Sequence, residues 1–313
     1  MNNNITGSFD NRVKTFLNEE IDFTTVSKNK IEKILLLDDI LEIIILPDVH
    51  SKPDNPFPTG IVTLTSNTIY PFAIGQEIGC GIRLLKTSLD IQDINKKFLD
   101  NYFTCLKDYL RDGRKKVTLF TKEEYLNILF KGYEWGVEKF DTERHCSIDV
   151  TMSYLPFKFC VKDILSAIPK DAFIAGYQRL GTLGGGNHFL EFQSISEILD
   201  RNACDKFGLQ KGKILILFHT GANVFAKRFD NYYGVRFQKH GWDKILRKNF
   251  RKFLYHFNDF RLWRFLHRLN LFFSKDFKGI YADSLEGRKY LLGFYAAMNY
   301  GFVNRTIISQ FVY

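Results

Sequence analysis

The sequence predicts one domain of mixed helices and strands, of the α/β or α+β class. Apolar residues make up 45% of its 313 residues, which is enough for a sizeable core. Short β-branched runs alternate with longer stretches of helical pattern, as in mixed folds. A chain of this length forms one large domain or two ordinary ones. Because no repeat, low-complexity tract or linker interrupts it, a single domain is the simplest prediction.

The elements are predicted in chain order from apolar periodicity and from residues that break regular structure. Helices are predicted at residues 13–17, 28–37 and 162–168, and across most of residues 91–140. Strands are predicted at residues 42–46, 61–64, 82–87, 188–192 and 213–218.

Prolines mark the end of the first predicted strand. Pro47 follows the apolar run 42–46, so Asp48 and His50 are expected on the loop that leaves this strand. Functional side chains are common in such places. Three prolines within residues 51–58 remove three backbone donors, which predicts an irregular loop.

Cysteine usage and hydropathy predict a cytoplasmic protein. The five cysteines are scattered, and no pair has the close spacing of a zinc knuckle, which favours a reduced chain over a disulfide scaffold. Residues 1–10 are polar and lack the apolar segment of a signal peptide. Apolar runs such as residues 43–47 are too short to span a bilayer, so no membrane partner is expected.

Positive charge is concentrated in residues 227–278. This basic stretch contains fourteen Lys or Arg and four Asp, whereas the whole chain has a net charge of +9. Aromatic residues alternate with the basic ones. Basic side chains neutralise phosphates and aromatic rings stack on unpaired bases, so the pattern indicates RNA. The alternative is a pair of amphipathic helices with a solvated basic face and an aromatic core face. We favour the amphipathic-helix interpretation for most of the aromatic residues and RNA contact for some of the Lys and Arg.

Three segments combine a metal-binding side chain with glycine. Cys80 lies between Gly79 and Gly81, three residues after Glu77; His188 follows a run of three glycines; His219 is followed by Thr220-Gly221. Cys, His and carboxylates bind metals, and glycine lets the backbone adopt positive φ and approach a ligand closely. A lone Cys is more often a small buried hydrophobe, and a lone His is often a core residue. Their recurrence beside glycine favours one metal centre that acts on a phosphate-bearing substrate.

These segments resemble the RtcB family of RNA-splicing ligases. Asp48-Val49-His50 is similar to an early Asp-x-His element of that family, and residues 181–191 are the most specific match. Further similar segments are Pro58–Val62, Tyr70–Gly75, Ser284–Gly287, Tyr290 and Asn304-Arg305. The resemblance implies an α+β fold: a single RtcB-like domain over residues 1–313, with mixed sheets, surrounding helices and an incomplete C-terminal part.

The resemblance implies two Mn²⁺ sites that share Cys80. Glu77 and His188 would complete one site, and His219 would belong to the other, which would be incomplete in this chain. Asp48 would be an orienting residue in catalysis.

The resemblance also implies GTP as a second cofactor. Asn187 would approach the nucleotide phosphates, and Phe189 and Glu191 would contact the guanine. The alternatives are a loop cap for Asn187 and an exposed strand position for Glu191.

The chain departs from the family pattern at several places. Glu77 stands where the family has Asp, and Ala222-Asn223 replaces a Ser-Arg pair whose Arg binds an RNA phosphate. Lys227 or Arg228, about one helical turn later, is a candidate substitute. The family's third metal-binding His and its guanylylated His have no match in this sequence. His240, His256 and His267 lie in the basic stretch and match no family element.

The activity implied by the resemblance joins an RNA 3′-phosphate or 2′,3′-cyclic phosphate to a 5′-hydroxyl, with tRNA among the substrates. Without a nucleophilic His, residues 1–313 alone are expected to bind metal, RNA and weakly GTP, but not to form a protein–GMP adduct. A non-catalytic RNA- and metal-binding relative and a hydrolytic metalloenzyme remain alternatives. The sequence leaves open whether an archease-like activator takes part.

Overall fold

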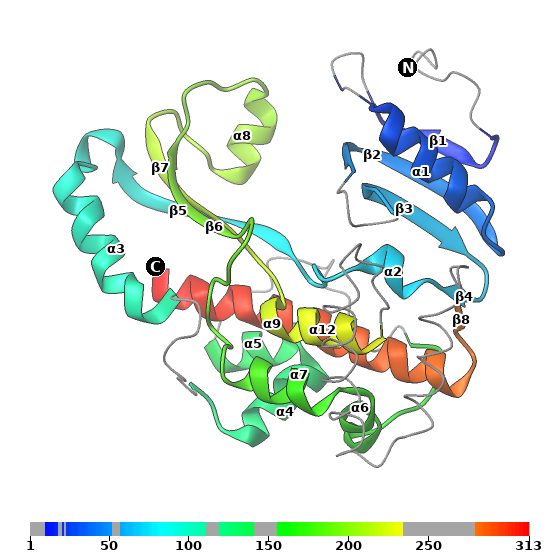
Figure 1. Cartoon of the computed structure of the whole chain (residues 1–313). Coiled ribbons are helices and arrows are strands. Elements are labelled where there is room, and N and C mark those ends of the chain that lie inside the picture. The colour runs from blue at the N-terminus through cyan, green and yellow to red at the C-terminus, as the bar shows by residue number, and fades with distance from the viewer. Residues whose placement is uncertain are drawn as a thin grey trace, which may run out of the picture. The chain divides into compact units, whose positions relative to one another are not determined.

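The computed structural model describes residues 10–17, 21, 23–51, 57–110, 119–140, 155–233 and 279–312 (Figure 1). The chain divides into two compact units. The first comprises Met1–Gly75 and Asn231–Arg288, and the second comprises Gln76–Asp230 and Lys289–Tyr313. Both units contain helices and strands, so the predicted mixed class is confirmed. Among the described residues, no helix is long and apolar enough to cross a membrane.

The first unit contains a three-stranded sheet covered by a helix. Strands β1 (Val13–Thr15), β2 (Ile40–His50) and β3 (Thr59–Thr65) lie in that order. Helix α1 (Thr25–Leu35) begins at Thr24, whose hydroxyl accepts a hydrogen bond from Ser27 N. Ile31 and Ile34 of α1 are buried with Ile43 and Ile45 of β2 in one core. The same unit holds β4 (Thr68–Ile69), α2 (Pro71–Ile74) and β8 (Ile280–Tyr281), with β4 antiparallel to β8.

The helix predicted at residues 13–17 is wrong, because Val13–Thr15 forms strand β1. Its backbone pairs in parallel with β2 through hydrogen bonds from Ile43 N to Arg12 O and from Phe16 N to Ile45 O, both 2.9 Å long. Five residues carry too little periodicity to separate helix from strand, so pairing with β2 decides the outcome.

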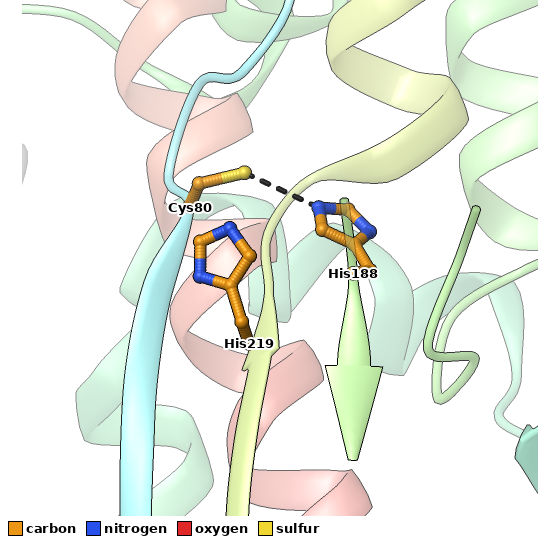
Figure 2. A group of neighbouring side chains, drawn as sticks. All are labelled: Cys80, His188 and His219. Atoms are coloured by element: carbon orange, nitrogen blue, oxygen red, sulfur yellow. Dashed lines mark hydrogen bonds between the residues drawn. The ribbon is translucent and has the colours of Figure 1, made fainter. Parts of the chain in front are cut away.

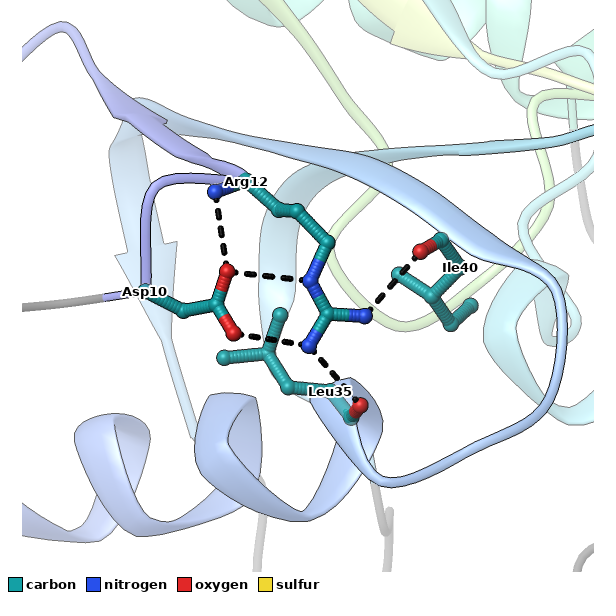
Figure 3. Close-up of polar contacts among 4 residues, drawn as sticks. All are labelled: Asp10, Arg12, Leu35 and Ile40. Carbon is teal, nitrogen blue, oxygen red and sulfur yellow. Dashed lines mark hydrogen bonds and ion pairs between the residues drawn. The ribbon is translucent and has the colours of Figure 1, made fainter.

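Arg12 fixes the start of β1 (Figure 3). Its guanidinium donates to both carboxylate oxygens of Asp10 and to the carbonyls of Leu35 and Ile40. These bonds tie β1 to the end of α1 and the start of β2. The hydrogen bonds from Arg12, those of its side chain first, lower the pKa of Asp10 from 3.8 to about 2.

The prediction that Asp48 and His50 lie on a loop after Pro47 is also wrong, because strand β2 continues to His50. The register shifts between Ile45, which pairs with Ile61, and His50, which pairs with Thr59. The extra residues of β2 form a bulge, where a proline can lie without breaking the strand.

Gly60 lets β3 approach the bulge. Its φ is +77°, and a Cβ there would lie 2.6 Å from the backbone of Asp48. Residues 52–56 of the predicted irregular loop lie outside the described residues.

The second unit is built on an antiparallel sheet in the order β5-β7-β6. The strands are β5 (Gly81–Asp90), β7 (Lys213–Thr220) and β6 (Phe189–Ser194), which confirms the three strands predicted there. One face of the sheet packs against helices α3 (Lys96–Leu110) and α12 (Leu285–Val312). Its core includes Leu106, Ile216, Phe218, Ile308 and Val312.

Helices make up most of the rest of the second unit (Figure 1). The helices are η1 (Ile91–Asp93), α4 (Lys122–Lys131), α5 (Tyr133–Phe140), α6 (Val161–Ala167), α7 (Lys170–Tyr177), α8 (Arg201–Phe207) and α9 (Asn223–Tyr233), the last of which extends into the first unit. The helical character predicted for residues 91–140 and 162–168 is therefore confirmed where the structure describes them. Most of the basic stretch, residues 234–278, lies outside the described residues.

Candidate metal centre

Cys80 lies in a tight turn immediately before β5. Cys80 N donates to Glu77 O over 3.3 Å, and Gly79 has a φ of +69°. The turn rests on α12, because a Cβ on Gly301 would lie only 2.7 Å from Gly79 O. The glycine on each side of this contact therefore allows the thiol-bearing turn to approach the helix backbone.

His188 lies between the glycine-rich loop and β6. Gly184 of this loop has a φ of +91°. A Cβ on Gly184 would lie 2.6 Å from His188 Nδ1 and 2.3 Å from Asn223 Oδ1. Only glycine lets the loop lie this close to the imidazole and to the first residue of α9.

His219 is the penultimate residue of β7. Its neighbour Phe218 is fully buried in the core, so the alternation of side chains directs His219 to the other face of the sheet. In the register, His219 pairs with Ile82 of β5 and with Phe189 of β6. The imidazole is thereby carried to the edge where the cysteine turn and the glycine-rich loop meet.

Cys80, His188 and His219 form one cluster (Figure 2). One ligand atom from each lies within 4.8 Å of the others. Cys80 Sγ lies 3.4 Å from His188 Nε2, and the two imidazole centroids are 5.3 Å apart. The three side chains come from three segments that are distant in sequence. The clustering of three metal-binding side chains, which the sequence only suggested, is therefore a property of the fold.

The donor set of this triad suits a divalent transition metal. A thiolate and two imidazoles are ligands for such ions. His219 Nδ1 is buried and has no hydrogen-bond partner among the residues that the structure describes. A buried imidazole nitrogen without a partner is costly in a protein that holds nothing there. The triad is therefore a candidate site for a metal ion.

The other predicted metal ligand lies nearby but outside the triad. Glu77 is exposed on the same turn as Cys80, and among the described residues the cluster within 4.8 Å comprises only the three other side chains. A role for Glu77 as a ligand stays a prediction.

Asp48 belongs to the first unit and is exposed. His50 Nδ1 lies 2.7 Å from the Asp48 carbonyl and 3.6 Å from its carboxylate. Asp48 is thus placed to orient His50. Its predicted part in catalysis is not tested by this contact.

The three predicted nucleotide contacts lie on or beside β6. Asn187 is exposed in the turn before the strand, and the Phe189 ring stacks on His219 at 6.0 Å and 26°. Glu191 is exposed and accepts a hydrogen bond from Gln193 Nε2 over 2.9 Å. Because strand side chains alternate, Phe189 and Glu191 share the sheet face of His219. Their contact with guanine stays a prediction.

Two residues beside the triad had no predicted role. Arg305 donates hydrogen bonds to the carbonyls of Gly79 and Thr220, which flank Cys80 and His219 in sequence. Asn223, at the first position of α9, donates from Nδ2 to Thr182 O over 3.0 Å. The sequence signal for Arg305 is its place in a family-like segment, and that for Asn223 is a departure from the family pattern.

Comparison with known proteins shows which sequences this chain is similar to. The sequence model of one family, described as tRNA-splicing ligase RtcB, matches residues 30–313. A tRNA-splicing ligase RtcB of Archaeoglobus fulgidus is 26% identical over 280 residues, which cover 86% of this chain and 50% of the relative. That of Nanoarchaeum equitans is 27% identical, covering 87% of this chain and 51% of the relative.

A eukaryotic relative gives the same picture. The RNA-splicing ligase RtcB homolog 1 of Entamoeba histolytica is 26% identical, covering 89% of this chain and 48% of the relative. The chain thus spans about half the length of the curated relatives that it matches. Because the family match covers most of the sequence and includes all three triad residues, this chain belongs to the RtcB family of tRNA-splicing ligases.

Proposed function

We propose that the protein acts in joining RNA ends, with Cys80, His188 and His219 binding Mn²⁺. The observation that carries the proposal is the triad itself, which gathers a thiol and two imidazoles within 4.8 Å inside a family match. When bound, the metal would neutralise the charge of a triphosphate and align the attacking group. Cys80, whose Sγ lies 3.4 Å from His188 Nε2, is the candidate for a shared ligand, with Glu77 as a further donor from the same turn.

The nucleotide in this proposal is GTP. Asn187, with an exposed amide in the turn before β6, and Glu191, with an exposed carboxylate on β6, lie on either side of Phe189 in the sequence. An amide can donate to phosphate oxygens, whereas a carboxylate accepts from the donors on the edge of a guanine ring. The Phe189 ring, which stacks on His219, would link the nucleotide contacts to the metal ligands.

The substrate in this proposal is RNA with a 3′-phosphate or 2′,3′-cyclic phosphate and a 5′-hydroxyl. The relatives are named as tRNA-splicing or RNA-splicing ligases. The basic stretch supports a polyanionic partner, because its Lys and Arg can neutralise phosphates. A tRNA substrate, an archease-like activator and a cytoplasmic location are further parts of the proposal.

A second candidate is a relative that binds metal and RNA without catalysing ligation. Two observations favour it. Glu77 lies outside the triad in the described part of the chain. Asn223, where the family has a phosphate-binding Arg, instead holds the Thr182 carbonyl.

The two candidates are separated by incubating the pure chain with labelled GTP, Mn²⁺ and an RNA carrying the two kinds of end. A protein–GMP adduct and a sealed RNA product would support the ligase. Binding of Mn²⁺ and RNA without either product is what we expect of residues 1–313 alone, and it would support the binding protein for this chain. Repeating the reaction with His219→Ala serves as the control, because removing a triad ligand should abolish metal-dependent steps.

A further inference from the structure

Helix α12 places two buried polar residues beside the metal triad. Asn304 is fully buried and Arg305 is 7% exposed. Long polar side chains are seldom buried without a partner, so their contacts indicate what they do.

Arg305 joins the two segments that carry Cys80 and His219. Its Nη1 donates to Gly79 O and to Thr220 O, the latter over 2.9 Å. Gly79 directly precedes Cys80, and Thr220 directly follows His219. The guanidinium lies against Gly81, since a Cβ there would be 3.2 Å from Arg305 Cζ. One side chain therefore fixes the ends of β5 and β7 at the point where both ligands leave the sheet.

Asn304 joins the third segment to the same point. Its Oδ1 accepts from Gly181 N over 2.7 Å, and its Nδ2 donates to Thr182 O over 3.0 Å and to Gly221 O over 3.2 Å. Residues 181–182 begin the loop that leads to His188. Adjacent positions of α12 thus hold all three ligand-bearing segments by their backbones.

We propose that Arg305 is a positioning residue for the metal centre, assisted by Asn304. The proposal rests on the metal site proposed above. A metal site binds tightly when its ligands are held in place before the ion arrives, and residues behind the ligands supply that rigidity. The planar guanidinium can donate to two carbonyls at fixed positions, whereas the lysine ammonium is a point charge on a flexible stem. Loss of these two hydrogen bonds should let the Cys80 turn and the end of β7 move apart, although all three ligand side chains remain.

Arg83 provides a matched control. It lies on β5, and its guanidinium donates to the hydroxyls of Thr306 and Ser309 on the same helix, over 3.4 and 3.1 Å. These two bonds reach side chains of α12 and not the carbonyls of Gly79 and Thr220 that Arg305 holds. If substitution only loosens the packing of α12 on the sheet, variants of Arg83 and of Arg305 should be affected alike. If it disturbs ligand positioning, only the variant of Arg305 should be affected.

The experiment titrates Co²⁺ into the metal-free chain of residues 1–313. It follows the visible absorption bands of Co²⁺ and the thiolate-to-cobalt charge-transfer band, and urea unfolding is measured in parallel. Arg305→Lys should weaken Co²⁺ binding about ten- to a hundredfold and alter the bands. Arg83→Lys should bind Co²⁺ as the unaltered chain does. Both conservative variants keep the charge and the alkyl stem, which favours folding.

Three outcomes would overturn the proposal. Unchanged Co²⁺ affinity and spectrum in Arg305→Lys would show that the guanidinium is not needed to position the ligands. The proposed metal site itself would stand. Equal weakening of Co²⁺ binding in Arg83→Lys would show that Arg305 acts only through the packing of α12 on the sheet. Absence of Co²⁺ binding by the unaltered chain would remove the metal site itself, and the inference with it.

Discussion

Gly221 lies directly against Cys80: a Cβ atom at Gly221 would be 2.7 Å from the Cys80 Sγ, Cα and N atoms. Ala222 N also donates to Ile78 O over 3.2 Å, which ties the chain after β7 to the cysteine turn. The Cys80 turn can lie this close to the end of β7, which carries His219, only because Gly221 has no side chain. Glycine here serves close approach of two backbones.

Gly221→Ala should consequently weaken metal binding, because the added methyl displaces the thiol from the two imidazoles. We expect a loss of affinity of at least tenfold, measured by Co²⁺ titration. Gly136→Ala is the control, since a Cβ there meets only ordinary contacts of 3.6 Å and longer. Equal affinity in the two variants would show that the turn yields to the methyl group without moving the thiol.

Two neighbouring tyrosines should respond in opposite directions to loss of the hydroxyl. The Tyr125 hydroxyl is buried without a hydrogen-bond partner among the described residues, and burial raises the pKa of Tyr125 well above its usual value. The Tyr300 hydroxyl donates to Gly176 O over 3.1 Å. In urea unfolding, Tyr125→Phe should raise the free energy of unfolding by about 1 kcal/mol, and Tyr300→Phe should lower it by about 1 kcal/mol. A loss of stability in both variants would indicate that the Tyr125 hydroxyl is satisfied.

The Asp10–Arg12 contact predicts a pH dependence of stability. Hydrogen bonds from Arg12 lower the pKa of Asp10 from 3.8 to about 2 in the folded chain. The stability contributed by this carboxylate is therefore fully present above pH 3.8 and is lost as pH falls through about 2. Asp10→Asn should lower the free energy of unfolding at neutral pH, with a deficit that shrinks over this window. A deficit that stays constant with pH, in urea unfolding at several pH values, would assign the effect to packing.

The basic stretch predicts RNA binding that weakens with salt. Replacing Arg247, Lys248, Arg251 and Lys252 with Gln should lower affinity for many RNA sequences alike. For single-stranded RNA, each lost phosphate contact should reduce the slope of log affinity against log salt by about 0.7. Fluorescence anisotropy at several salt concentrations provides the measurement.

A charge-matched control separates contact from net charge. Four exposed lysines elsewhere, each replaced with Gln, remove the same charge: Lys96, Lys97, Lys122 and Lys211. An unchanged affinity and salt slope in the basic-stretch variant would assign that stretch to solvation or packing.

Local pattern predicted the strands of the second unit well but failed where tertiary contacts decide. The run Lys213–Phe218 is apolar and β-branched, so burial between layers could be predicted from composition alone. Val13–Thr15 became a strand only through pairing with β2. Pro47 did not end its strand, because a bulge opposite Gly60 accommodates it.

The sequence predicted the residue types of the candidate site. It did not predict the residues of α12 that hold the ligand-bearing segments in place. Glycine beside Cys80, His188 and His219 indicated close approach, and the family resemblance indicated that they meet. The contacts of Arg305 with Gly79 and Thr220 join positions 226 and 85 residues apart. No local pattern records such a contact, since it follows from how α12 packs on the sheet.

The most direct test of the metal centre compares Mn²⁺ binding by the unaltered chain, Cys80→Ala and Cys105→Ala, using equilibrium dialysis and elemental analysis. Cys105 is exposed on α3 and serves as the matched thiol control. We predict that the unaltered chain and Cys105→Ala bind Mn²⁺ equally and that Cys80→Ala loses most of the bound metal. Equal metal content in Cys80→Ala and the unaltered chain would contradict the assignment of Cys80, His188 and His219 as a metal site.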